Sequence, residues 1–280
     1  MKTTGIFTLM FKLFSLIIVL SFFATSIMGC SLFRKKYEKK ETKEYKLSVI
    51  NKKKIQLDNL NGDIKIKSNS FDNNLIVKAD ITVYLTKKEL DKEDDYTKVS
   101  FDTTESTIRI STERKSTRNH FVFFGSQHDK INYEIDVPSG ISVSVDNTNG
   151  RITLEKMDND VKIDLVNGDI KFSRLSGQLD FDVTNGKIKG DADSTKGMSI
   201  NTVNGNVELT LSEYFTGKFN MQTVNGKISK KDFNFKNTNE EKRSFKGELG
   251  SNGPDVKIET VNGKITLKKK DSATQGSNNE

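Results

Sequence analysis

The chain has 280 residues, of which 45 are lysine or arginine and 38 are aspartate or glutamate, so its formal net charge is +7 at pH 7. Its single cysteine excludes an intramolecular disulfide and a cysteine-based metal cluster, so stability must come from a packed core. Basic and acidic residues are interleaved along the chain, which argues against a nucleic-acid partner.

Residues 1–29 are typical of an export signal. Lys2 and Lys12 precede an apolar run at residues 13–23, which is shorter than the about 20 residues that a membrane span needs. Ile27 stands three residues before Cys30 and Gly29 directly before it, an arrangement that resembles the bacterial lipobox. This resemblance implies cleavage before Cys30 and acylation of that cysteine, so we expect an exported lipoprotein anchored to a membrane of the cell envelope.

Residues 30–46 are predicted to be the lipidated cysteine and a charged spacer. Residues 34–46 (RKKYEKKETKEYK) carry seven basic and three acidic side chains, a mixture that favours a solvated spacer over contact with lipid headgroups. The folded domain is predicted to span residues 47–270, and the polar residues 271–280 (DSATQGSNNE) are predicted to be a disordered tail.

The first half of this domain is irregular but has β-strand character. It contains one Asn-Gly pair at residues 61–62, and strand-like apolar runs follow at residues 75–85, 107–112 and 131–137. The charged residues 87–95 (KKELDKEDD) predict a surface insertion or a single helical turn. We expect this half to form the cap and first sheets of the domain, because the end of a repeat array needs cover.

Residues 114–129 (RKSTRNHFVFFGSQHD) hold both histidines of the chain, His120 and His128. The two histidines, with Asp129 beside the second, could ligate a metal. However, two histidines eight residues apart with no further ligand at a spacing typical of metal sites are a weak signal, so no metal site is predicted. The aromatic residues between the histidines alternate as in a buried edge strand, which we favour over a partner-binding loop. The candidate interaction residues of such a loop are His120, Phe121, Phe123 and Phe124.

The remainder of the domain is organised by a repeat whose mark is Asn-Gly. The corner glycines are Gly62, Gly150, Gly168, Gly186, Gly205, Gly226 and Gly263, with intervals of 18, 18, 19, 21 and 37 residues from the second onward. The residues seven before, five before and two after each glycine are apolar, whereas those four before and one after are polar. This alternation predicts a strand, a corner and a strand in each repeat, and Asn-Gly suits a type I′ turn.

Two all-β architectures fit such a unit, an antiparallel meander of hairpins or a β-solenoid in which each repeat is one coil. Both bury the same columns of residues. The near-constant spacing, with extra residues only away from the corner, favours a β-solenoid or single-sheet roll of about 18–21-residue repeats. Six coils between residues 143 and 267 would rise about 24 Å from first to last at ~4.8 Å per strand.

Acidic residues four before the glycine, such as Asp146, Asp164 and Asp182, would stack from coil to coil. Such a ladder could bind calcium or a sugar acid. Basic residues one and three after the glycine, among them Lys171 and Lys189, are expected within reach, so exposed ion pairs are favoured. Asparagine and threonine three before the glycine are predicted to fix register by bonding to a neighbouring coil.

Several segments resemble the bacterial putative-adhesin β-strand-repeat family, a domain of unknown function. They are residues 137–140 (VPSG), the Thr-Val-Asn-Gly corners at 202–205, 223–226 and 260–263, and residues 250–254 (GSNGP). The resemblance covers most of residues 45–270. It implies a solenoid-like β fold on exported or membrane-tethered chains and assigns no activity.

No serine-nucleophile elbow, P-loop, paired zinc motif or dinucleotide fingerprint occurs in the sequence, so we expect neither enzymatic activity nor a cofactor. The sequence predicts a cell-envelope lipoprotein with a non-catalytic, adhesin-like or scaffold module that binds an envelope protein or a glycan. Two alternatives stay open. One is an envelope-stress accessory protein, and the other is a carbohydrate-active β-helix enzyme, which needs clustered carboxylates without basic neighbours.

Overall fold

The computed structural model describes residues 37–69, 73–85, 87–90, 97–114 and 128–270, which belong to one compact unit. The predicted signal, Cys30, the tail at residues 271–280 and the candidates His120, Phe121, Phe123 and Phe124 lie outside the described residues. Within the described ranges, no helix has both the length and the apolar character that membrane crossing requires.

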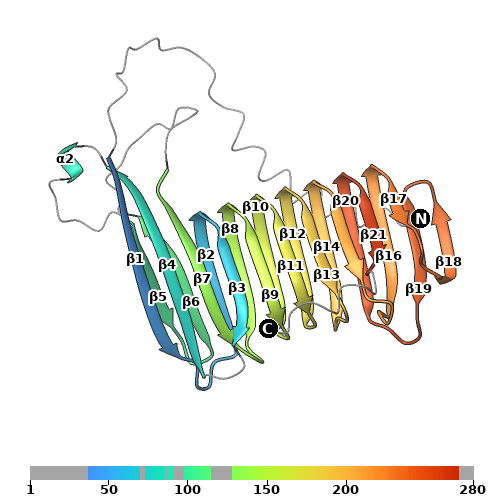
Figure 1. Ribbon diagram of the computed structural model, residues 1–280, viewed down its shortest axis with the longest axis horizontal. Helices are drawn as coiled ribbons and strands as arrows, with labels where there is room; N and C mark the ends of the chain where they lie inside the picture. The colour runs from blue at the N-terminus through green and yellow to red at the C-terminus, as the bar shows by residue number, and fades with distance from the viewer. Residues whose placement is uncertain (1–36, 70–72, 86, 91–96, 115–127, 271–280) are drawn as a thin grey trace, which may run out of the picture. The chain divides into compact units, whose positions relative to one another are not determined.

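The described strands form two sheets that lie face to face (Figure 1). Sheet A has the spatial order β1 (Tyr37–Ser48), β4 (Asn74–Leu85), β7 (Lys130–Pro138), β3 (Ile64–Asn69), β9 (Ile152–Met157), β11 (Ile170–Leu175), β13 (Ile188–Ala192), β15 (Val207–Leu211), β21 (Ile265–Lys269) and β17 (Ile228–Lys230). Sheet B has the spatial order β18 (Lys236–Glu241), β19 (Ser244–Leu249), β16 (Gly217–Asn225), β20 (Asp255–Asn262), β14 (Gly197–Asn204), β12 (Gln178–Asn185), β10 (Val161–Asn167), β8 (Ser142–Asn149), β2 (Lys54–Asn61), β6 (Thr107–Arg114) and β5 (Thr97–Thr103). The residues predicted as an insertion or helical turn begin with one helical turn, α2 (Lys87–Leu90).

Parallel pairing of like positions distinguishes the solenoid from the meander. In sheet B, Val161 of β10 lies opposite Val143 of β8 and Leu179 of β12, and all three stand seven residues before a corner glycine. In sheet A, Ile170 of β11 likewise lies between Ile152 and Ile188. Hairpins would make these neighbours antiparallel. Each repeat therefore contributes one strand to each sheet, and the predicted all-β solenoid is confirmed.

The coils do not stack in sequence order. The early coil β2–β3 lies directly beside β8–β9 and also pairs with β6 and β7. The last coil, β20–β21, lies between β14–β15 and β16–β17. The six-coil stack predicted for residues 143–267 is therefore extended by one coil, and its last two coils exchange places. The long interval before the last glycine contains the hairpin β18–β19, which covers β16.

Residues 37–46 correct the prediction of a solvated spacer, because they form most of β1. This strand pairs with β4 in an antiparallel ladder along its whole length, from Tyr37 opposite Leu85 to Ser48 opposite Asn74. Tyr45 packs on the core, and its ring centroid lies 4.8 Å from that of Phe101. Charged side chains are common on edge strands, so the composition of this segment concealed its structure.

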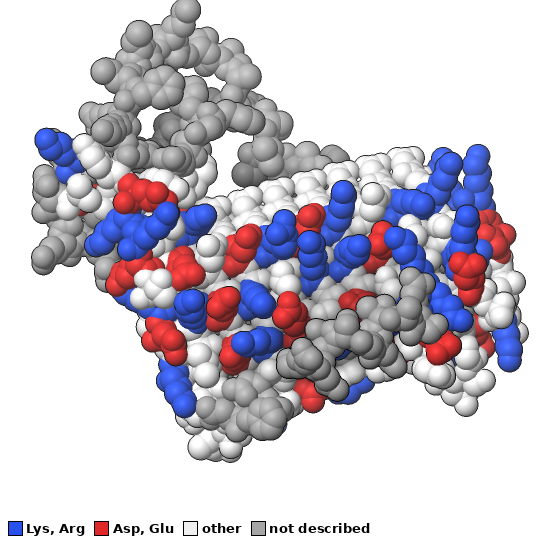
Figure 2. Space-filling model, viewed as in Figure 1, with Lys and Arg blue, Asp and Glu red and all other residues white. Residues whose placement is uncertain are grey.

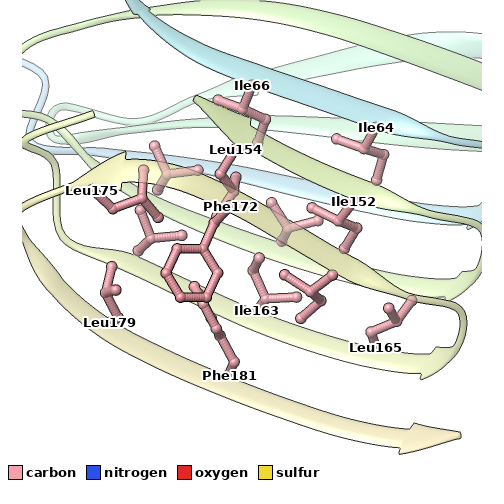
Figure 3. Packing of buried hydrophobic residues seen from close by; sticks show 14 of the residues in the cluster. Ile64, Ile66, Ile152, Leu154, Ile163, Leu165, Phe172, Leu175, Leu179 and Phe181 are labelled. Carbon is pink, nitrogen blue, oxygen red and sulfur yellow. The ribbon is translucent and has the colours of Figure 1, made fainter. Parts of the chain in front are cut away.

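The core fills the space between the two sheets along the whole stack. Figure 3 shows inward-pointing residues of β3, β9 and β11 meeting those of β10 and β12. Phe172 and Phe181 come from opposite sheets and form an edge-to-face pair with ring centroids 5.5 Å apart. A Cβ atom on Gly190 would lie 2.2 Å from the ring of Phe172, so this glycine provides room for the ring. Complete burial of one such side chain contributes about 1.5–3 kcal/mol.

The corner glycines are required chiefly by the closeness of neighbouring coils. A Cβ atom on Gly186 would lie 1.7 Å from the carbonyl oxygen of Gly168, and the other corner glycines meet a backbone oxygen in the same way. The asparagine before each glycine has negative φ, so the prediction of a type I′ turn was wrong. The chain passes from one sheet to the other at this corner and does not reverse as it would in a hairpin.

Asn147, Thr223 and Thr260, each three residues before its glycine, bond to the corner of a neighbouring coil, as predicted, whereas the buried hydroxyl of Thr202 has no hydrogen-bond partner among the described residues. The Asn147 side-chain amide donates to the carbonyl oxygen of Gly62 at 3.3 Å. The hydroxyl groups of Thr260 and Thr223 donate to the carbonyl oxygens of Gly205 and Gly263, each at 3.1 Å. These bonds satisfy backbone groups that the corner would otherwise leave unpaired.

Candidate binding surface

The asparagines of the corners form a continuous side-chain ladder along one edge of the stack. Each Nδ2 donates to the Oδ1 of the next asparagine at 2.8–3.0 Å, in the order Asn225, Asn262, Asn204, Asn185, Asn167, Asn149 and Asn61. The Asn61 amide then donates to the carbonyl oxygen of Asp129 at 3.2 Å. Sequence analysis treated Asn-Gly as turn chemistry and missed this ladder, although the recurrence of asparagine at every corner was its signal.

A row of uncharged side chains lies beside this asparagine ladder, one residue earlier in each coil. In spatial order the row consists of Leu60, Thr148, Val166, Thr184, Val203, Val261 and Val224. Leu60 and Val224 are 41% and 44% exposed, and the five residues between them are half-buried. We call the row and the asparagine ladder together the corner band. The edge at which the arrowheads of β8, β10, β12 and β14 end in Figure 1 is correspondingly white in Figure 2.

The acidic residues four before the glycine stack in register on the outer face of sheet B, in the order Asp58, Asp146, Asp164 and Asp182. Burial, followed by the charges and hydrogen bonds of Asp164 and Asp58, raises the pKa of Asp146 to about 6. Burial likewise raises the pKa of Asp182, against a hydrogen bond from Asn201 that lowers it. The column therefore holds close carboxyl groups of which at least one is hard to ionise.

Among the four acids of this column, ion pairs of the predicted kind are formed by Asp58 and Asp164, whereas Asp146 and Asp182 accept hydrogen bonds from the amides of Gln56 and Asn201. Arg109 Nε lies 3.1 Å from Asp58 Oδ2, and Lys162 Nζ lies 3.4 Å from Asp164 Oδ2. The Gln56 amide donates to Asp58 at 3.2 Å and reaches Asp146 at 3.5 Å.

The source of the bases differs from the prediction. Arg109 and Lys162 stand on sheet B itself, two residues before the acid column, whereas Lys171 and Lys189 lie on sheet A. There Lys189 pairs with Glu208 at 3.2 Å. In the face that Figure 2 shows, basic and acidic side chains are interspersed. In the part of the chain that the structure describes, no group of three or more histidine, cysteine, aspartate or glutamate side chains could hold a metal ion.

Asp129, considered in the sequence as a metal ligand, has a structural position. Its buried carboxylate accepts hydrogen bonds from the Tyr84 amide at 2.9 Å and from the Thr97 hydroxyl at 3.1 Å. Its carbonyl oxygen accepts hydrogen bonds from Asn61 and from Arg114, the latter at 2.6 Å. Asp129 therefore joins strands of both sheets to the end of the asparagine ladder.

The raised pKa of Asp146 leads to a pH-dependent prediction. Because the folded-state pKa lies above the unfolded value, the contribution of this group to stability is largest below about pH 4 and is lost as pH rises through about 6. Asp146→Asn should therefore stabilise the protein at pH 7.5, by about 1 kcal/mol after allowance for solvent screening. At pH 4 the gain should nearly vanish.

Thermal unfolding at the two pH values checks this expectation. Asp255→Asn, which removes an exposed carboxylate from another column of the same sheet, is the matched control and should change stability little at either pH. An equal gain for Asp146→Asn at pH 4 and pH 7.5 would contradict the assignment.

Comparison with known proteins gives a family match. The model of the family described as Toastrack DUF4097 matches residues 35–268. No curated protein matches. A crystal structure of a "putative cell adhesion protein" from Clostridium sporogenes is similar at 13% identity and a TM-score of 0.46, covering 83% of this chain and 100% of that chain. A "putative adhesin" from Bacteroides fragilis is similar at 14% identity and a TM-score of 0.32, covering 82% and 97%. A "putative lipid binding protein" from Parabacteroides distasonis is similar at 13% identity and a TM-score of 0.26, covering 83% and 97%.

Proposed function

The chain belongs to the Toastrack DUF4097 family, and we propose that it is a cell-envelope lipoprotein whose repeat domain binds an envelope protein or a glycan without catalysis. The observation that carries the proposal is the corner band. It presents one asparagine and one uncharged side chain per coil in a straight row along seven coils. Exposed, regular, weakly polar rows of this kind suit an extended partner.

The outer face of sheet B supports binding over catalysis. A carbohydrate-active site on a β-helix requires carboxylates that are free of basic neighbours, whereas Asp58 and Asp164 are engaged by Arg109 and Lys162. Asp182 accepts a hydrogen bond from Asn201 at 2.9 Å. Exposed pairs of this kind solubilise a surface and contribute about 0–1 kcal/mol each.

The proposed anchor at Cys30 would hold the domain close to a membrane surface. The lipobox-like residues 27–30 and the short apolar run before them support this part of the proposal. Tyr37, the first residue of β1, follows Cys30 by seven residues, which reach at most about 24 Å when fully extended. A partner of the corner band would thus be met near the membrane.

One experiment tests the anchor and the band together. Cells expressing the full chain are labelled with radioactive fatty acid, and isolated envelope fragments are then incubated with added protein. Cys30→Ala should not incorporate the label. Retention of the added Cys30→Ala protein on the fragments therefore reports binding by the domain without the lipid anchor. Val166→Lys and Val261→Lys, introduced together into the Cys30→Ala protein, should reduce that retention about tenfold. The reason is that binding of the partner would bury two unpaired charges.

The matched control is the pair Thr153→Lys and Thr266→Lys, which adds the same charges to half-buried positions on the outer face of sheet A. Retention should then be unchanged. Protease treatment of the fragments separates a protein partner from a glycan. Undiminished label in Cys30→Ala would refute the anchor, and equal retention of the band and control variants would refute the binding surface.

A further inference from the structure

The strand β1 differs from the strands at the other sheet ends. At the far end of sheet A, β17 has three residues, and in sheet B the edge strand β18 has a register irregularity between Lys236 and Asn239. The remaining edge strand, β5, has seven residues. Short or irregular edges of this kind resist pairing with another chain. β1, by contrast, has twelve residues in unbroken register with β4 and is largely exposed.

We propose that β1 is a self-association edge. In this arrangement β1 pairs antiparallel with β1 of a second copy of the chain about a two-fold axis at Thr42. The two ten-stranded A sheets then become one continuous sheet. The occupant of the edge is thus another molecule of the same protein, in a symmetric interface of the kind that most homo-oligomers use.

Backbone geometry limits the registers that such a pair can adopt. In an antiparallel ladder, two residues that lie opposite each other either both direct N–H and C=O toward the partner strand or both direct them away. This direction alternates along each strand. Two identical strands must therefore pair even-numbered residues with even and odd with odd, so the two residue numbers of every pair have an even sum.

Charge selects one of these registers. With Thr42 opposite itself, Glu41 faces the partner's Lys43, Lys40 faces the partner's Glu44, and Glu38 faces the partner's Lys46. By symmetry each of these opposite-charge pairs occurs twice. On the face that carries Tyr45 and Leu47, the same register sets Tyr37 beside the partner's Leu47 and Lys39 beside the partner's Tyr45. Opposite charges and aromatic–aliphatic contacts both stabilise cross-strand pairs.

The adjacent allowed registers fail on the same criterion. Centring the pair on Glu41 puts two glutamates opposite each other and sets Lys39 against the partner's Lys43. Centring it on Lys43 puts two lysines opposite each other and sets Lys40 against the partner's Lys46. Like charges directly opposite destabilise a sheet. The charge pattern of β1 therefore disfavours slipped registers. It is self-complementary when the antiparallel pair is centred on Thr42.

The charges of β1 can change partners at little cost. Lys40 lies 3.2 Å from Glu38 and Lys43 lies 3.4 Å from Glu41, both within the strand and both with exposed carboxylates. Exposed pairs of this kind contribute about 0–1 kcal/mol. Pairing with a second copy replaces them with cross-strand pairs and adds backbone hydrogen bonds along the edge.

A charge swap tests this edge. The full chain in mild detergent is examined by sedimentation velocity over a range of concentrations, where we expect a reversible dimer. Lys40→Glu sets glutamate against the partner's Glu44 twice, and Glu44→Lys sets lysine against the partner's Lys40 twice. Each change alone should raise the dimer dissociation constant about tenfold or more. The double variant restores opposite charges with the same composition and should recover the wild-type value.

Cross-linking then fixes the register. Thr42→Cys places two thiols directly across the two-fold axis, where opposed Cβ atoms lie about 4.5–5.5 Å apart, so oxidation should give a disulfide-linked dimer. Lys46→Cys is the control, because its two copies would lie eight residues apart along the ladder. The unsubstituted chain controls for Cys30. A monomer at all concentrations, a double variant that fails to recover, or equal cross-linking at both positions would overturn the proposal.

Discussion

Gly186→Ala is expected to lower the free energy of unfolding by about 3 kcal/mol or more. Two costs combine at this corner. Gly186 has a φ of +156°, and its added Cβ would lie 1.7 Å from the carbonyl oxygen of Gly168 in the neighbouring coil. Backbone strain and overpacking each cost about 1–3 kcal/mol, and the stacked coils leave little room for relief. Urea unfolding followed by circular dichroism measures the loss.

Two other glycines separate these costs. Gly140 has a φ of +79° with no atom within 4 Å of an added Cβ, so Gly140→Ala should show the backbone term alone, about 1 kcal/mol. Gly205 lies outside the left-handed range, yet its Cβ would be 1.7 Å from the carbonyl oxygen of Gly186. Gly205→Ala should therefore approach the full loss. A Gly186→Ala loss no greater than that of Gly140→Ala would show that the coils are not so closely stacked.

Phe181→Ala is the second change with a large expected effect, a loss of about 3–5 kcal/mol. The ring is fully buried in β12, near the middle of the stack, and packs edge-to-face on Phe172 of the opposite sheet. In a repeat array each coil is supported only by its neighbours, so a cavity in a central coil weakens the contact between the two halves. The measurement is again the urea midpoint and its slope.

Phe101→Ala is the matched control, because this ring is only partly buried and lies on β5, the last strand at one end of sheet B. Its loss should be less than half of the loss at Phe181. Similar losses at the two positions would mean that stability is not concentrated in the central coils.

The repeat made the core predictable because the same three positions of each unit meet the same surroundings. The residues seven and five before every corner glycine are buried, as the alternation indicated. The exception among those two after the glycine is Ile228, which is partly buried because β17 is the last strand of sheet A. Periodicity could describe the inside of a coil but not whether a further coil follows it.

The order of the coils could not be predicted for the same reason. Every Asn-Gly corner offers its neighbours an equivalent set of backbone and asparagine groups, so Asn262 can bond to Asn204 as readily as Asn225 could. The hairpin β18–β19 distinguishes the coil β16–β17 from the coil β20–β21. Its strand β19 pairs with the edge of β16 that faces away from β20, so β20 takes the position inside the stack. That preference depends on contacts between distant segments, which no local pattern encodes.

The candidate surface was predicted in part. Charge alone indicated ion pairs along the acid column, and these form at Asp58 and Asp164 but are replaced by amide hydrogen bonds at Asp146 and Asp182. It did not indicate that Lys162, two residues before Asp164 on the same face of β10, would be the partner, because the bases expected within reach of the acids were those after the corner. The asparagine ladder required knowledge that the corners stack in parallel, which followed only from the strand pairing.

The place of the last coil has a consequence for how the domain is completed during synthesis. The coils β14–β15 and β16–β17 emerge first, but they cannot become direct neighbours in the finished stack, because residues 255–269 lie between them. Residues 255–269 therefore insert between two coils that precede them in the chain. Loss of these residues would not shorten the stack at its end; it would remove an interior layer and detach the end that is already made.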